Sequence, residues 1–302
     1  MFFNLYNHLV KSELDLSQLG VTRASSKEIP LKYDIKITIQ KKKSSSDFIG
    51  MVDNQTAVDK ELGYYLKKGV AFFEFFKGKE IRVTPLDTID QDLIRVSLNY
   101  PIASLFYQRG FFLLHASAVK YRHRVFLFPG NSLSGKSSLA ALLINQGGKL
   151  LTEDTAVMKF KKNKVLIYPS YPMLKISDEV KEAIKFPYSS DLIFNKEQNN
   201  RKGYLLNSDK FLNQESQIDY CIFPVWCRNK DRLFNPEKSI SLFMLLQSSL
   251  NIYPLNKQKE KDLFKLNALF LKNVDTYLYE RPKDLAFINQ FLDKIDFLLE
   301  NE

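Results

Sequence analysis

The feature that most constrains this chain is the glycine-bounded segment at residues 130–138. It fits the pattern G-x-x-x-x-G-K-[ST], which binds phosphate groups when it joins a strand to a helix. Residues 124–129 form a short apolar run typical of a buried strand, and residues 139–144 form an apolar run typical of a helix. Because the motif lies in this context, we expect a nucleotide or phosphate site and disfavour a chance match in an ordinary turn.

Each position of this segment has a physical task. Gly130 and Gly135 let the backbone turn sharply, so that its N–H groups can approach phosphate oxygens. The N-terminus of the following helix adds partial positive charge. Lys136 can reach the β- and γ-phosphates, and the hydroxyl of Ser137 can bind Mg²⁺. The predicted binding set is Gly130, Asn131, Ser132, Leu133, Ser134, Gly135, Lys136, Ser137 and Ser138.

Composition limits the class of protein. The chain has 302 residues, 45% of them apolar, which is typical of a globular protein with one large core or two domains. No apolar run approaches the length of a membrane span, and the N-terminus lacks the features of a signal peptide. The two cysteines, Cys221 and Cys227, do not suit a disulfide framework or a zinc site. We therefore expect a cytoplasmic protein.

The net charge is +10, and a basic surface attracts nucleic acid, anionic lipid, nucleotides or acidic peptides. The excess is spread along the chain, and the lysine clusters at residues 41–43 and 159–164 lack the interleaved aromatics of a nucleic-acid motif. We expect these clusters to be solvated loops, with no nucleic acid or membrane as partner. Arg201 and Lys202 could clamp phosphate or an acidic peptide, but a solvated loop is favoured there too.

Hydrophobic patterns predict the order of elements. Residues 1–28 look helical at first and then polar, residues 33–39 alternate as a strand, and residues 70–84 form a hairpin. A helix follows over 89–109, interrupted near Pro101, and then strands over 111–119, 125–128, 149–158, 164–169 and 219–226. A short helix is expected over 178–185, a loop-rich stretch over 191–213 and a mostly helical tail from residue 240, with residues 284–299 amphipathic. We therefore predict a β-rich N-terminal accessory region (1–100) and a catalytic domain with a helical C-terminus (101–302).

The acidic pair Glu153 and Asp154 follows an apolar run, one helix and one turn after Lys136. That connection can bring the end of a strand back beside the segment at residues 130–138, called the phosphate loop below, as in a βαβ crossover. Carboxylates there can hold Mg²⁺ or accept a proton from an attacking hydroxyl. A solvated turn is the alternative. His115 lies on an apolar strand, where a lone histidine is more often a core residue.

Together these pieces resemble the catalytic domain of HPr kinase/phosphorylase and the HPr-kinase-related proteins. The similarity covers residues 111 to about 176: the His115–Val119 segment, the phosphate loop, the glycine pair at 147–148, the segment ending in Glu153 and Asp154, and the Tyr-Pro pairs at 168–172. It implies an α/β (α+β) fold with a phosphoenolpyruvate-carboxykinase-like core. It also implies transfer of the γ-phosphoryl group of ATP or GTP, with Mg²⁺, to a serine hydroxyl.

Carried over by position, the resemblance makes Glu153 the base and places Asp154 beside it, with His115 near the transferred phosphate. The implied catalytic set is Glu153, Asp154, His115 and Lys136, and the implied metal ligands are Ser137, Asp154 and Glu153. Glu153 stands where the family has an aspartate, and the phosphorylase signature segment is not evident after Ile176. The Tyr-Pro segment instead looks like kinases found beside ribosomally made peptide clusters.

We therefore expect a Mg²⁺-dependent kinase whose acceptor is a serine or threonine hydroxyl, in a peptide or protein and not in HPr. Two alternatives stay open: a kinase of an amino acid or other hydroxylated metabolite, and a catalytically weak nucleotide-binding module. The sequence leaves the acceptor, the choice among ATP, GTP and pyrophosphate, and a homo-oligomeric state open.

Overall fold

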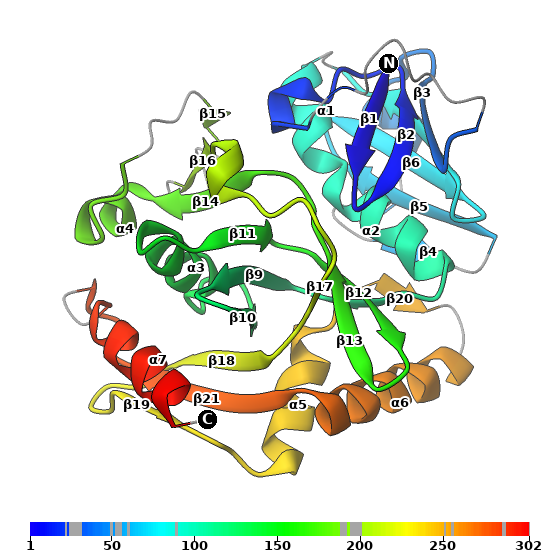
Figure 1. The fold of residues 1–302 in the computed structure, drawn as a ribbon. Coiled ribbons are helices and arrows are strands. Elements are labelled where there is room, and N and C mark those ends of the chain that lie inside the picture. The colour runs from blue at the N-terminus through cyan, green and yellow to red at the C-terminus, as the bar shows by residue number, and fades with distance from the viewer. Residues whose placement is uncertain are drawn as a thin grey trace. The chain divides into compact units, whose positions relative to one another are not determined.

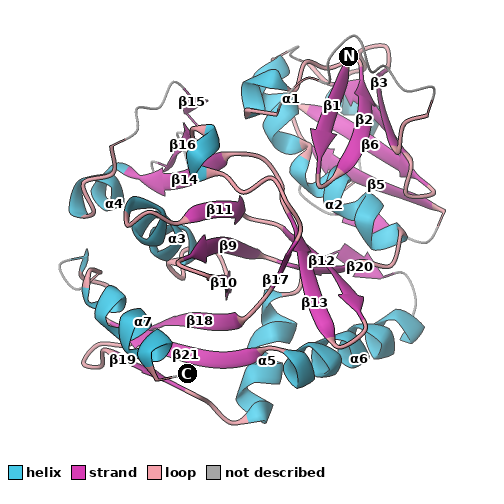
Figure 2. Ribbon diagram, in the orientation of Figure 1, coloured by secondary structure: helices cyan, strands magenta, loops and turns pink. Residues whose placement is uncertain are grey.

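The structure is a computed structural model and describes residues 1–21, 23, 32–48, 51, 56–58, 61–87, 90–187, 192–193, 201–250, 252–254, 257–285 and 288–301. The chain is a mixed α/β protein (Figures 1 and 2). It divides into two compact units, one of residues 1–113 with 250–263 and the other of residues 114–249 with 264–302. The three boundaries between the units fall within β8 (Phe112–Leu114), after Ser249 and within α6 (Lys257–Asn273).

The first unit is built on an eight-stranded sheet with the order β1-β2-β3-β7-β6-β5-β4-β20. Its elements are β1 (Phe2–Leu5), β2 (His8–Ser12), β3 (Ile35–Ile39), β4 (Thr56–Val58), β5 (Leu62–Lys67), β6 (Ala71–Phe76), β7 (Glu80–Pro85), β20 (Ile252–Pro254), α1 (Gln91–Ser97) and α2 (Asn99–Gln108). The predicted hairpin is confirmed as β6 and β7, in which Phe76 pairs with Glu80. The helix predicted over 89–109 is two helices, and Pro101 lies in the first turn of α2, where its missing N–H costs nothing.

The helical start predicted for residues 1–28 is wrong. Residues 2–12 form a hairpin instead, in which Leu5 pairs with His8. Tyr6 and Asn7 have φ angles of 52° and 56°, and this pair of left-handed residues makes a two-residue turn that matches the twist of the flanking strands. Residues 22 and 24–28 lie outside the described residues.

The second unit carries the phosphate loop, on a six-stranded sheet with the order β11-β9-β10-β18-β21-β19. These strands are β9 (Ala116–Tyr121), β10 (Arg124–Pro129), β11 (Lys149–Thr152), β18 (Tyr220–Trp226), β19 (Arg232–Phe234) and β21 (Asp275–Arg281). Its other strands are β12 (Ala156–Lys161), β13 (Lys164–Tyr168), β14 (Met173–Ser177), β15 (Leu192–Ile193), β16 (Arg201–Leu205) and β17 (Ser216–Gln217). Its helices are α3 (Lys136–Asn145), α4 (Asp178–Ala183), α5 (Lys238–Ser248) and α7 (Gln290–Glu300).

The centre of this sheet is parallel. β10 pairs with β18, and β18 pairs with β21, all in the same direction. Their carboxyl ends therefore meet at one edge, which is where open α/β sheets bind ligands. β9 lies antiparallel between β10 and β11, so the connection from β10 through α3 to β11 is a crossover between strands that run the same way. The expected crossover is thus confirmed.

Helix α3 is buried on every side. Its residues 139–144 are apolar and buried, and they belong to one hydrophobic cluster with Phe128 of β10, Leu174 of β14 and Phe291 of α7. A helix that is apolar all round needs cover on all faces. Because α3 is held in this way, its N-terminus and the loop before it have one fixed position relative to the sheet.

The mostly helical tail predicted from residue 240 is only partly correct. Helices α5, α6 and α7 are present, but β21 is a strand that lies between β18 and the edge strand β19 in the six-stranded sheet. Likewise, residues 201–205, predicted as loop, form β16, which pairs with β14. In both cases pairing with a distant strand decides the local conformation. Residues 191 and 194–200 lie outside the described residues.

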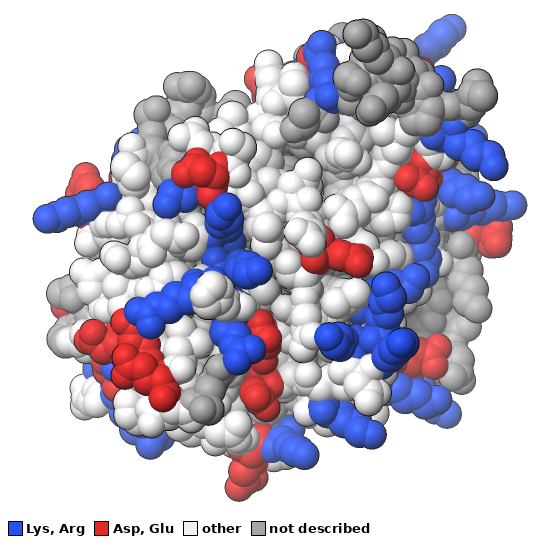
Figure 3. Space-filling view, in the orientation of Figure 1, with Lys and Arg blue, Asp and Glu red and all other residues white. Residues whose placement is uncertain are grey.

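None of the helices in the described part of the chain combines the length and apolar character needed to cross a bilayer. Figure 3 shows basic side chains spread over one face and interspersed with acidic ones.

Candidate phosphate-binding and catalytic site

The phosphate loop connects β10 to α3, as predicted. Gly130 has a φ of 154° and Gly135 a φ of 103°. A Cβ at Gly130 would come within 2.7 Å of Ser134 Oγ, and one at Gly135 within 3.3 Å of Arg281 Nη1. The positive φ angles favour glycine at both positions, and the close approach of Ser134 favours it further at Gly130.

Lys136 is buried at the start of α3, and its Nζ donates a hydrogen bond to the Asn131 carbonyl oxygen at 2.8 Å. The amine thus folds back over its own loop, where bound phosphate would lie. Burial lowers the pKa of Lys136, while Asp154 and Glu153 oppose that shift. The first residue of the helix therefore brings a cation and the helix N-terminus to the same point.

Glu153 folds back onto this loop. Ser137 Oγ donates to Glu153 Oε1 at 2.6 Å, and Ser117 Oγ donates to Glu153 Oε2 at 2.6 Å. The side chain is fully buried, and burial together with the neighbouring Asp154 charge raises its pKa, which the two serine hydrogen bonds oppose. The predicted return of the acidic pair to the phosphate loop is confirmed.

Asp154 has a different environment. Its φ of 63° is left-handed, a conformation that aspartate tolerates better than most residues. Lys175 Nζ donates to its Oδ2 at 2.7 Å, and the two side chains are 15% and 20% exposed. Lys175, with His115 and Lys136, outweighs burial and holds the pKa of Asp154 well below its usual range. Asp154 is therefore ionised at neutral pH.

His115 lies at the bend between β8 and β9, not within a continuous strand. Its backbone N–H donates to Ser248 O at 2.7 Å, and its carbonyl oxygen accepts from the N–H of Gly130 at 3.2 Å. Burial and the nearby Lys136 lower its pKa to about 4, against the opposing charge of Asp154. The structure thus brings His115 to the same site as a neutral imidazole.

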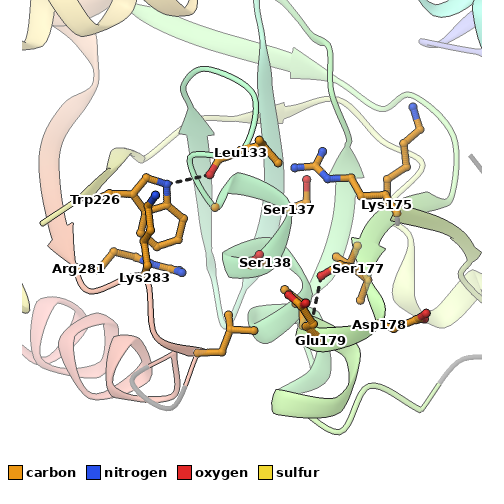
Figure 4. A pocket seen from close by; sticks show the side chains of 15 residues that line it. Leu133, Ser137, Ser138, Lys175, Ser177, Asp178, Glu179, Trp226, Arg281 and Lys283 are labelled. Atoms are coloured by element: carbon orange, nitrogen blue, oxygen red, sulfur yellow. Dashed lines mark hydrogen bonds between the residues drawn. The ribbon is translucent and has the colours of Figure 1, made fainter. Parts of the chain in front are cut away.

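A cleft of about 620 Å³ opens beside the loop (Figure 4). Trp226 and Arg281 lie on one side of it and Lys175 on the other, with Ser137 between them. Its lining residues are Leu133, Gly135, Ser137, Ser138, Lys175, Ile176, Ser177, Asp178, Glu179, Val180, Arg201, Trp226, Arg281, Lys283 and Leu285. Such a volume is in the usual range for small-molecule and cofactor sites.

Sequence reasoning missed Ser117, Lys175, Trp226 and Arg281 as members of this site. Lys175 gave a weak signal, since it interrupts the apolar run of β14. Arg201, which was expected in a solvated loop, lines the cleft from β16, and Lys202 pairs with Asp178 at 2.7 Å. Cys221 is buried, and burial raises its thiol pKa well above the usual value, so it is not a reactive group.

The donor set suits Mg²⁺. Among the described residues, no three His, Cys, Asp or Glu side chains gather as a metal cage. Mg²⁺ is usually held by one or two carboxylates together with substrate phosphates. The hydroxyl of Ser137 and the carboxylate of Glu153 are adjacent hard oxygen donors that could hold the ion in this way, with Asp154 next in the chain.

Comparison with known proteins gives little. No protein-family model matches this chain, and no curated protein matches it. Among solved structures, the Hpr(Ser) kinase/phosphatase from Coxiella burnetii is similar at 14% sequence identity and a TM-score of 0.33, over 63% of this chain and 99% of that one. We therefore base the functional proposal on the geometry of the site.

Proposed function

We propose that this chain is a phosphotransferase that moves the γ-phosphoryl group of ATP or GTP to a hydroxyl group. The observation that carries the proposal is the hydrogen bond between Ser137 and Glu153, which joins the phosphate loop to the acidic pair. A loop that only holds phosphate has no need of two carboxylates at its helix N-terminus. We also propose that the second unit has the kinase-like core that the sequence resemblance implies.

Asp154 is the better placed of the two carboxylates to accept the proton of the acceptor. Both oxygens of Glu153 already accept hydrogen bonds from serine hydroxyls inside the protein. Asp154 is ionised and partly exposed beside Lys175. We therefore assign proton transfer to Asp154, and to Glu153 the orientation of Ser137 and a share in holding the metal.

The reaction would proceed by direct transfer. The acceptor oxygen forms a bond to the γ-phosphorus, the bond from that phosphorus to the β,γ-bridging oxygen breaks, and the acceptor proton passes to Asp154. Ser137 and Glu153 would hold Mg²⁺, which would supply positive charge to neutralise the phosphate oxygens. Lys136 and the loop amides stabilise the negative charge of the transferred group.

The acceptor is a serine or threonine hydroxyl of a peptide, or else a hydroxylated small molecule. The test is transfer of label from γ-labelled ATP with Mg²⁺ to a pool of peptides and, separately, to hydroxylated amino acids and metabolites. We expect label in one pool, and its loss in Lys136→Ala. Tight nucleotide binding without transfer to either pool would leave only a nucleotide-binding module.

A further inference from the structure

Arg281 is a buried cation that lacks a full set of partners. Its side chain is only 3% exposed at the carboxyl end of β21. Among the residues that the structure describes, Nη1 is buried and has no hydrogen-bond partner. Leaving a buried donor unsatisfied costs about 1–3 kcal/mol, and more for a charged group. A position of this kind is typical of a residue whose partner is a ligand.

The sheet aims this guanidinium at the phosphate loop. Trp226 and Arg281 are directly paired at the ends of the parallel strands β18 and β21. The guanidinium carbon lies 4.2 Å from the centre of the Trp226 ring, and Trp226 Nε1 donates to Leu133 O at 2.9 Å. Nη1 would be 3.3 Å from a Cβ at Gly135, so it lies against the loop itself.

We propose that Arg281 is a phosphate-binding residue, and that its Nη1 donates to a phosphate oxygen of a nucleoside di- or triphosphate held by the loop. The inference rests on the proposed function only in that the ligand is a nucleotide. Arg281 then supplies a further cation, on a different wall of the cleft from Lys175. Trp226 keeps the guanidinium in place by stacking on it.

The chemistry favours arginine at this position. A guanidinium is planar, stacks on an aromatic ring and presents fixed N–H donors that match phosphate oxygens. Burial lowers the pKa of Arg281, opposed mainly by Tyr279, but a guanidinium remains protonated at neutral pH. Lysine would keep the charge but lose both the stacking and the fixed direction of the donor.

The experiment measures nucleotide affinity by calorimetry in the full chain, with Arg281→Gln, Arg281→Lys and the matched control Arg232→Gln. Arg232 also stacks on an aromatic ring, Phe234 at 4.5 Å, but it pairs with Glu280 and lies outside the cleft. The probes are ADP, tripolyphosphate and adenosine. Because Trp226 is the only tryptophan of the chain, its fluorescence reports separately whether each probe reaches this wall.

We expect Arg281→Gln to weaken ADP and tripolyphosphate binding by about tenfold or more, with Arg281→Lys between it and the wild type and Arg232→Gln within about twofold. Adenosine binding should not change.

An ADP affinity within about twofold of wild type in a folded Arg281→Gln protein would overturn the inference, as would an equal loss for adenosine. If ADP binding depends on Arg281 but no phosphoryl transfer is found, the inference stands and the proposed function fails. If phosphoryl transfer is found but Arg281→Gln leaves the ADP affinity unchanged, the proposed function stands and the inference fails.

Discussion

Glu153 and Asp154 are adjacent in sequence, but their environments shift their pKa values in opposite directions. Glu153 is sealed between two serine hydroxyls, and burial raises its pKa. Asp154 turns away through a left-handed backbone to Lys175, which lowers its pKa. Two carboxylates whose pKa values are moved apart are suited to different tasks.

The first prediction concerns the roles of the two carboxylates. Asp154→Asn should lower the rate of phosphoryl transfer by about 10²- to 10⁴-fold at saturating Mg²⁺, because it removes the proton acceptor. Glu153→Gln keeps the shape of the side chain and should mainly raise the Mg²⁺ concentration needed, by about 10- to 100-fold. Steady-state rates over a Mg²⁺ titration measure both. The opposite pattern, with a rate loss at saturating Mg²⁺ only in Glu153→Gln, would contradict the prediction and make Glu153 the proton acceptor.

The second prediction is a pH dependence of stability. Because the pKa of Glu153 is raised in the folded protein, the folded state binds this proton more tightly than the unfolded chain. Stability from this group is complete below the ordinary glutamate pKa and is lost as pH rises towards the folded value. The glutamine side chain in Glu153→Gln has no carboxyl group to ionise, so this loss is absent from the variant. Its stability relative to wild type should therefore increase with pH.

Urea unfolding without divalent metal, from about pH 5 to about pH 9, measures this difference. Glu280→Gln is the matched control, since the hydrogen bond from Arg232 lowers the pKa of Glu280, so that its stabilising effect is lost only at acidic pH, as pH falls. A difference between Glu153→Gln and wild type that stays constant over the range would contradict the prediction.

The third prediction concerns His115. Burial and Lys136 lower its pKa to about 4, so the imidazole stays neutral between about pH 6 and pH 8. Its ring proton signal in NMR spectra should not shift over that range, and the signal is identified by its absence in His115→Gln. A titration midpoint above about pH 6 would show that the imidazole carries charge under working conditions.

The fourth prediction concerns Ser117. Ser117→Ala removes the donor to Glu153 Oε2 in a fully buried site and should destabilise the fold by about 1–3 kcal/mol, measured by urea unfolding. Ser134→Ala is the control, because Ser134 Oγ is buried with no hydrogen-bond partner among the described residues. Its loss should change stability much less. Equal losses of unfolding free energy in the two variants would mean that the hydrogen bond from Ser117 to Glu153 does not stabilise the fold.

The phosphate loop and its flanking strand and helix could be predicted from the sequence, because their interactions are local. Gly130, Gly135, Lys136 and Ser137 lie within eight positions, and the geometry of a strand–loop–helix turn does not depend on the rest of the chain. The return of Glu153 to Ser137 was also predictable, since one helix and one short turn leave the next strand few places to go.

Only the tertiary structure decided which side chains form the wall of the cleft that contains Arg281. Arg281 reaches the loop because β21 pairs in parallel with β18, and residues 275–281 show that role only as a weak alternation in a segment expected to be helical. Tyr6 and Asn7 likewise form a turn because the sheet fixes the twist of the strands they join. Local sequence sets which residues can hold phosphate, whereas the register between distant strands decides which further side chains meet it.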